Sequence, residues 1–153
     1  MARLSPDVFY IGTDAIADNL RDASRRAAGN VLFARLSLED APAALAAFAD
    51  RLTILFPWGS LLRAVADGEG DLLQRLRALC KPGADVRFVF ELSSEPRNLE
   101  RRYLEAGLAL SGRALSLDEA RALPTTWAKK LGYSGRQRSF WEFRGTAAMA
   151  GSR

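Results

Sequence analysis

The sequence predicts an α/β fold in which the strands of a mostly parallel sheet alternate with helices. Short apolar runs of β type recur along the chain, and segments with helical spacing and cap residues lie between them. The 153 residues, 48% hydrophobic and 26% charged, have the balance of one compact domain. We therefore expect a single domain over residues 1–146 and a small, polar, flexible tail over residues 147–153.

The predicted strands share a short apolar core rich in β-branched and aromatic residues. In chain order they are Val8–Ile11, Val31–Phe33, Leu52–Phe56, Asp85–Glu91, the less regular Leu108–Leu115, and Ser139–Phe143. Helical patterns cover Ala15–Ala28, Leu61–Leu79 as one interrupted helix or as two, Leu99–Ala106, and a short acidic turn at Asp118–Ala120. Asp14 is a candidate N-cap, Gly29 and Gly107 are stop signals, and Pro124 follows the last helix.

Two tryptophans stand at positions suited to binding a flat ligand. Leu52–Phe56 runs into a Pro-Trp-Gly corner, which puts Trp58 beyond the carboxyl end of a strand, where α/β sheets bind ligands. Trp127 also follows a proline and precedes Lys129 and Lys130. A nucleobase, planar and tethered to phosphate, suits two such rings. The alternative for each ring is burial in the core.

Positive charge is concentrated at the C-terminal end. The net charge is +4, but residues 121–153 hold seven of the 22 Lys and Arg residues and one acid, Glu142, a net +6. Residues 1–120 carry 15 basic residues against 17 acidic ones, a net −2. A basic end on a slightly acidic body is typical of a surface that contacts phosphate, and the alternative is a solvated basic tail.

The absence of histidine restricts the chemistry. Histidine-based triads and the usual zinc-ligand sets are excluded, and the single cysteine, Cys80, is expected to pack as a small apolar residue. A reaction that needs no enzymic base therefore fits best. No apolar run reaches membrane-spanning length and no secretory signal begins the chain, so we expect a cytoplasmic protein.

Five segments carry a resemblance to a known family: Phe9–Asp14, Asn30–Phe33, Leu55–Leu62, Thr125–Lys130 and Arg138–Trp141. They resemble the aminoglycoside-resistance methyltransferases that modify N1 of a decoding-site adenine in the 16S rRNA of the small ribosomal subunit. The Phe-Pro-Trp-Gly-Ser and Thr-Thr-Trp motifs are specific, and the resemblance covers nearly the whole chain. It implies a Rossmann-like sheet that binds S-adenosylmethionine and methylates that adenine, which confers aminoglycoside resistance.

The resemblance also implies a cofactor site at the carboxyl ends of the strands. Asp14 matches the acid after the second strand, whose carboxylate accepts hydrogen bonds from both ribose hydroxyls of S-adenosylmethionine. Glu39 matches the acid after the third strand, near the cofactor adenine. Helix capping explains Asp14 equally well, and an ordinary surface acid explains Glu39 equally well.

For the target base, Trp58 and Trp127 match the two aromatic residues that sandwich a flipped adenine. Ser60 and Thr125 match polar residues that shape the pocket beside them. The cations at the family's RNA-contacting positions, which would position phosphates without reading sequence, are Lys129, Lys130, Arg136 and Arg138. Trp141 lies in an alternating segment and is expected to pack on the sheet.

The chain departs from the family at its N-terminal end. Members begin with a strand and an Asp-x-Gly-x-Gly turn, whereas Gly12 is the only glycine here before Asp14. We therefore expect a sheet without its first, central strand. Its open edges would pair with each other, pair with another chain as in a homo-oligomer, or leave the chain poorly stable. The alternative function is a catalytically inactive, truncated remnant that binds RNA or only dimerises.

Overall fold

The computed structural model describes residues 5–125, 128 and 139–149. The chain divides into two compact units, Met1–Pro42 and Ala43–Arg153. Trp127, Lys129, Lys130, Arg136 and Arg138 lie outside the described residues.

Unit 1 holds two parallel strands joined by a helix. Strands β1 (Tyr10–Asp14) and β2 (Val31–Arg35) pair in register from Tyr10 with Val31 to Asp14 with Arg35, and α1 (Ala17–Arg25) connects them. Gly12 lies opposite Phe33, and a Cβ at this position would lie 2.6 Å from the Phe33 ring, so a larger residue would require the ring to move. This βαβ arrangement confirms the expected parallel pairing.

The N-cap of α1 differs from the prediction. Ile16, not Asp14, is the N-cap residue, and the helix begins at Ala17. The Asp14 carboxylate instead accepts a hydrogen bond from the Ile16 backbone N–H at 2.8 Å, which forms a local turn between β1 and α1. Asp14 is therefore still part of β1, and its side chain stands at the carboxyl end of that strand.

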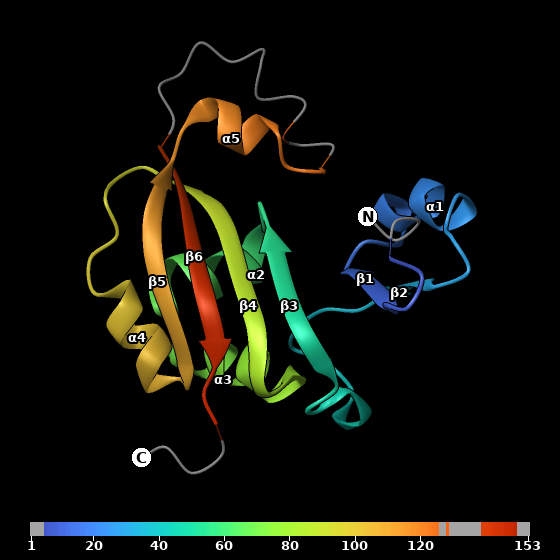
Figure 1. Ribbon diagram of the computed structural model, residues 1–153, viewed down its shortest axis with the longest axis horizontal. Helices are drawn as coiled ribbons and strands as arrows, with labels where there is room; N and C mark the ends of the chain where they lie inside the picture. Colours follow the sequence, from blue (N-terminus) through green and yellow to red (C-terminus); the bar gives the residue numbers. More distant parts are fainter. Residues whose placement is uncertain (1–4, 126–127, 129–138, 150–153) are drawn as a thin grey trace. The chain divides into compact units, whose positions relative to one another are not determined.

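Unit 2 is built on a four-stranded sheet with the order β3-β4-β6-β5 (Figure 1). Its strands are β3 (Ala49–Leu55), β4 (Cys80–Leu92), β5 (Leu108–Leu115) and β6 (Ser139–Ala147). β3 and β4 are parallel, whereas β6 runs antiparallel to both β4 and β5. This sheet is therefore mixed rather than mostly parallel. Because Leu115 pairs with Phe140, β6 starts beside the end of β5. The connection between these antiparallel strands therefore begins and ends at the same edge of the sheet.

Several helical segments of unit 2 lie within the described residues. They are α2 (Gly59–Arg63), the π-helix η3 (Ala64–Gly68), α3 (Gly70–Leu79), α4 (Leu99–Glu105) and α5 (Leu117–Arg121), preceded by the 3₁₀ turn η2 (Ala43–Leu45). The expected helix over Leu61–Leu79 is thus interrupted. The break falls at Gly68, whose φ of +64° suits glycine and ends the π-helix.

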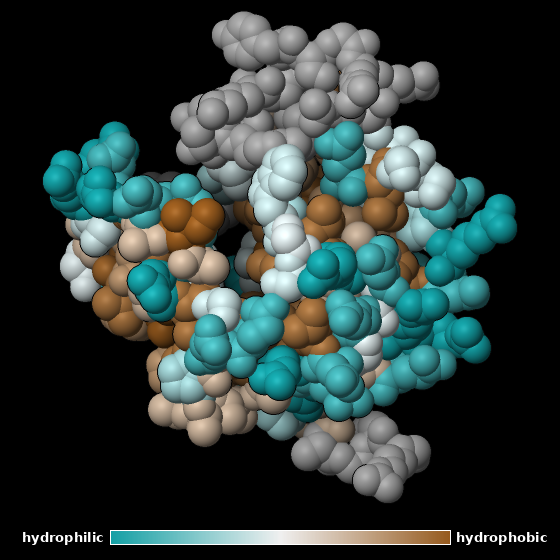
Figure 2. Space-filling model, turned by 180° about the vertical axis from the view of Figure 1, so that it is seen from behind, coloured by the Kyte–Doolittle hydropathy of each residue, from teal (hydrophilic) through white to brown (hydrophobic). Residues whose placement is uncertain are grey.

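The two faces of the unit 2 sheet are packed differently. Phe88 and Phe143 contact the buried Tyr103 of α4, with ring centroids 5.6 and 5.1 Å apart from it, so this face is covered by helices. Figure 2 looks onto that side and shows hydrophilic residues gathered over α4. Because side chains alternate along a strand, Val89 and Phe140 lie on the opposite face, where α5 packs.

Several remaining expectations are settled within the described residues. Cys80 is 1% exposed and burial raises the pKa of its thiol, which confirms a packing role. Trp141 is half-buried within β6. β6 ends at the buried Ala147, and the Ala148 carbonyl accepts a hydrogen bond from Arg77 at 2.6 Å. No helix in the described ranges is long and apolar enough to span a membrane.

Candidate functional site

The corner after β3 presents Trp58 to solvent. Phe56 and Gly59 have positive φ values of 50° and 61°, and these two residues turn the backbone sharply on either side of the Pro57-Trp58 pair. Trp58 is the N-cap of α2 and is 71% exposed. A ring this exposed gains little free energy from packing against the core. The alternative for Trp58, burial in the core, is therefore ruled out. The corner offers an aromatic surface at the carboxyl end of β3.

The corner shares a core cluster with the segment after α5. The buried members of that cluster are Phe56, Val89, Leu115, Ala120, Leu123, Ala128 and Phe140. Phe56 also donates its backbone N–H to the Val89 carbonyl at 2.7 Å and packs edge-on against Phe140 at 6.1 Å. Phe56 lies two residues before Trp58, and Ala128 lies one residue after Trp127. The cluster therefore joins the chain neighbours of both predicted stacking residues.

Thr125 and Ser60 lie close to this cluster in the sequence. The Thr125 hydroxyl accepts a hydrogen bond from the Ala128 backbone N–H at 2.9 Å, and the Thr125 N–H donates to the Leu123 carbonyl at 2.8 Å. Thr125 thus links Leu123, just after α5, to Ala128, a role that sequence reasoning did not assign to it. Ser60 is half-buried in the first turn of α2, next to the corner.

In unit 1, the two predicted cofactor-binding acids follow neighbouring parallel strands. Asp14 ends β1, and Glu39 is exposed in the turn region after β2. The Leu36 N–H donates to the Asp14 carbonyl at 3.0 Å, so the chain leaving β2 runs beside Asp14. The Asp14 carboxylate accepts from the Ile16 N–H and, at 3.0 Å, from the Asn19 side chain. Two oxygens carry about four acceptor sites, so capacity remains for two hydroxyl donors.

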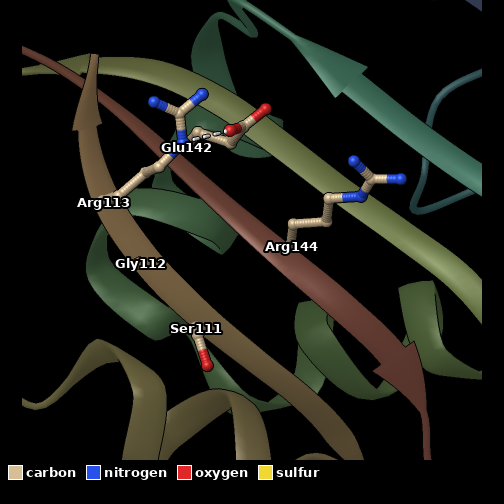
Figure 3. A pocket seen from close by; sticks show the side chains of 5 residues that line it. All are labelled: Ser111, Gly112, Arg113, Glu142 and Arg144. Carbon is tan, nitrogen blue, oxygen red and sulfur yellow. Dashed lines mark hydrogen bonds and ion pairs between the residues drawn. The ribbon is translucent and has the colours of Figure 1, made fainter.

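A chain of ion pairs crosses the sheet face that carries α5. The Glu142 side chain, 8% exposed, binds Arg87 of β4 at 2.6 Å and Arg113 of β5 at 2.8 Å. Arg113 also binds Glu119 of α5 at 2.7 Å. The Arg113 hydrogen bond, followed by those from Ser116, lowers the pKa of Glu119 to about 2. Figure 3 shows Arg113, Glu142 and Arg144 lining a hollow on this face together with Ser111 and Gly112.

Sequence reasoning missed this network and the cluster around Phe56. The Ser116-x-x-Glu119 spacing was a readable signal, because Ser116 and Glu119 form a capping box with bonds of 3.2 and 2.8 Å. The ion pairs of Glu142 with Arg87 and Arg113 could not be predicted from a local sequence motif. They depend on β6 lying between β4 and β5, an order that the sequence does not reveal.

Comparison with known proteins gives one consistent family. Residues 1–146 match the family model described as NpmA: 16S rRNA (adenine(1408)-N(1))-methyltransferase. An Escherichia coli protein named 16S rRNA (adenine(1408)-N(1))-methyltransferase is 30% identical over 168 residues, covering 91% of this chain and 76% of its own. A protein of the same name from Streptoalloteichus tenebrarius is 29% identical, covering 90% and 75%.

Solved structures show the same likeness. The 16S rRNA methyltransferase KamB is 26% identical with a TM-score of 0.84, covering 96% of this chain and 80% of that one. An antibiotic related methyltransferase is 30% identical with a TM-score of 0.81, covering 94% and 80%. A variant of the 16S rRNA (adenine(1408)-N(1))-methyltransferase from Catenulisporales acidiphilia with cosubstrate SAM has a TM-score of 0.81, covering 99% and 80%; at 24% identity it supports the fold alone.

Proposed function

Because the chain belongs to the 16S rRNA (adenine(1408)-N(1))-methyltransferase family, we propose that it methylates N1 of adenine 1408 in 16S rRNA and so confers aminoglycoside resistance. Beyond family membership, the proposal is supported by the exposed Trp58 ring, which lies on a corner with positive φ values at Phe56 and Gly59. Phe56 connects this corner to the buried cluster that contains Ala128. The substrate is the small ribosomal subunit, which places the reaction in the cytoplasm. The family match favours this reading over an inactive RNA-binding remnant.

In the proposed reaction, Trp58 and Trp127 stack on the two faces of an adenine that has left its helix. When bound, S-adenosylmethionine supplies an electrophilic methyl group on a sulfonium centre. Adenine N1 carries a free electron pair and no proton, so no residue of the chain has to act as a base. The work of the chain is to hold N1 in line with the methyl group, and its aromatic faces favour the cationic product ring. These roles agree with a chain that lacks histidine.

Asp14 is the residue proposed to hold the methyl donor. Its carboxylate stands at the carboxyl end of β1 and keeps free acceptor capacity beside the bonds to Ile16 and Asn19, which fits a pair of ribose hydroxyls. Glu39, in the turn region after the neighbouring strand, is proposed to lie near the adenine of the donor. The bonds to Ile16 and Asn19 fix the Asp14 side chain before any ligand arrives.

The proposed RNA contacts involve the basic C-terminal end. Lys129, Lys130, Arg136 and Arg138 would bind phosphates and orient the ribosomal subunit, with Thr125 and Ser60 shaping the base pocket. Support comes from the net charge of +6 over residues 121–153. Such contacts weaken with salt, so the affinity for the small subunit should fall by about one log unit per log unit of salt for each phosphate neutralised.

The function is tested by two measurements on the same preparation. Calorimetric titration with S-adenosylmethionine should show saturable binding, and small subunits incubated with both should acquire a methyl group on N1 of adenine 1408. The Asp14→Asn variant keeps an oxygen for the Ile16 N–H but loses the second acceptor and the charge, so its donor affinity should fall about tenfold or more. Asp18→Asn, which changes an exposed acid of α1, is the matched control. Absence of both binding and methylation in the unmodified chain would overturn the proposal.

Self-association is a separate proposal. In the part of the chain that the structure describes, β1 is hydrogen-bonded only to β2 within its sheet, and β3 only to β4, so each keeps one edge for a further strand. We expect a second copy to supply it. Light scattering over a concentration series should then give a mass that rises toward that of a dimer, and a constant monomer mass would contradict this proposal.

A further inference from the structure

We propose that Arg113 is a positioning residue for the methyl-transfer site: by joining Glu142 to Glu119 it fixes α5, and with it Thr125 and Ala128, which flank the predicted stacking position in the sequence. This inference rests on the proposed function. Within the described residues, Arg113 binds Glu142 and Glu119, so its effect would pass through α5.

Arg113 is the point where the sheet is joined to α5 by charge. Its Nε donates to Oε2 of Glu142 at 2.8 Å, and its Nη1 donates to Oε1 of Glu119 at 2.7 Å. Figure 3 shows the Arg113 side chain directed toward Glu142 on the sheet face that carries α5. A planar guanidinium with donors fixed in a fork can bind two carboxylates at once, which a lysine cannot do with the same geometry.

Glu142 provides the fixed end of this connection. Its side chain is 8% exposed, and Arg87 of β4 binds its other oxygen at 2.6 Å. Three neighbouring strands therefore contribute to one network, with Arg87 on β4, Glu142 on β6 and Arg113 on β5. A carboxylate held from both sides has little freedom to move, so it defines where Arg113 lies.

Glu119 provides the other end. It belongs to the first turn of α5 and also accepts the Ser116 N–H at 2.8 Å, so the same side chain caps the helix and binds Arg113. From α5 the chain continues to Leu123, whose carbonyl accepts the Thr125 N–H, and to Ala128, whose N–H donates to Thr125. A shift of α5 would therefore be transmitted to Thr125 and Ala128, which flank Trp127 in the sequence.

The experiment compares Glu119→Gln with Asp118→Asn. Both remove one negative charge from the first turn of α5, and glutamine can still complete the capping box, but only the first breaks the pair with Arg113. Amide hydrogen exchange at Thr125 and Ala128 should quicken about fivefold in Glu119→Gln and stay within about twofold of the unmodified protein in Asp118→Asn. Unchanged exchange in Glu119→Gln would overturn the proposal.

Kinetics provide a second readout. The kcat for methylation of small subunits should fall about tenfold in Glu119→Gln and in Arg113→Met, while KM for the subunit and Kd for S-adenosylmethionine change less than about twofold. Arg113→Lys should recover part of the loss, and the double variant should be no worse than either single one. Arg51→Met, which breaks an exposed pair with Asp85 away from α5, should match the unmodified protein.

The outcomes separate the two proposals. If the unmodified chain methylates and kcat is unaffected by breaking the Arg113–Glu119 pair, Arg113 has no positioning role. If the unmodified chain transfers no methyl group, the proposed function fails, and the exchange rates at Thr125 and Ala128 still decide whether Arg113 fixes this backbone.

Discussion

Phe56 and Ala128 pack in the same buried cluster, although Phe56 directly follows β3 and Ala128 lies in the segment after α5. Phe56 adopts a φ of 50° to turn toward Trp58, and Ala128 is fully buried next to Trp127 in the sequence. A non-glycine residue at positive φ is maintained only where the surroundings hold it. The packing of Phe56 against Phe140 and its bond to Val89 provide that restraint.

Enlarging Ala128 should therefore disturb the corner. Ala128→Leu adds volume to a closed cluster and should lower the free energy of unfolding by about 1–3 kcal/mol, measured by urea denaturation. Methylation should fall as well, because Phe56 has to move. Ala122→Leu, at an exposed alanine of the same segment, should change stability by less than about 0.5 kcal/mol. Equal effects of the two substitutions would mean that the cluster is not tightly packed around Ala128.

Trp58 should matter for methylation and not for stability. Because the ring is 71% exposed, Trp58→Ala should leave the free energy of unfolding within about 0.5 kcal/mol. Loss of one stacking face, worth roughly 1–3 kcal/mol, should lower kcat/KM about 5- to 150-fold, with Trp58→Phe in between. Leu104→Ala removes an exposed apolar side chain from α4 and should leave kcat/KM unchanged. A Trp58→Ala enzyme with full activity would remove this ring from the site.

Local sequence patterns predicted most of the strands of this fold, whereas the order and direction of the strands in the sheet depend on tertiary contacts. The six apolar runs all became strands, and β5 has the predicted bounds, because apolar composition and flanking turn residues act locally. The mixed direction of the sheet depends on β6 inserting between β4 and β5, which no local signal specifies. Likewise the position of Trp58 on an exposed corner could be predicted from the sequence, whereas the Arg87–Glu142–Arg113 network needed three strands in register.

Tyr103 should be a strong determinant of stability in unit 2. Its ring is fully buried between Phe88 and Phe143, and its hydroxyl donates a hydrogen bond to the Val65 carbonyl in the π-helix η3. Tyr103→Phe leaves that carbonyl without its donor, so the free energy of unfolding should fall by about 1–3 kcal/mol. Thermal and urea unfolding would measure the change. Tyr10→Phe, at a half-buried position in unit 1, is the control and should have a smaller effect.

The Arg113–Glu119 pair should make stability depend on pH in acid. The pKa of Glu119 is lowered to about 2 in the folded chain, chiefly by the Arg113 hydrogen bond, from an ordinary value near 4.5. A folded pKa below the unfolded one means that the contribution is fully present above about pH 5 and is lost as the pH falls toward about 2. The stability difference between the unmodified chain and Glu119→Gln, measured by urea unfolding, should therefore be constant from pH 7 to about 5 and shrink below that. Since Glu119 is exposed to solvent, 0.5 M salt should reduce the difference at every pH. A difference that grows as the pH falls from 5 to 2 would contradict this assignment of the carboxylate.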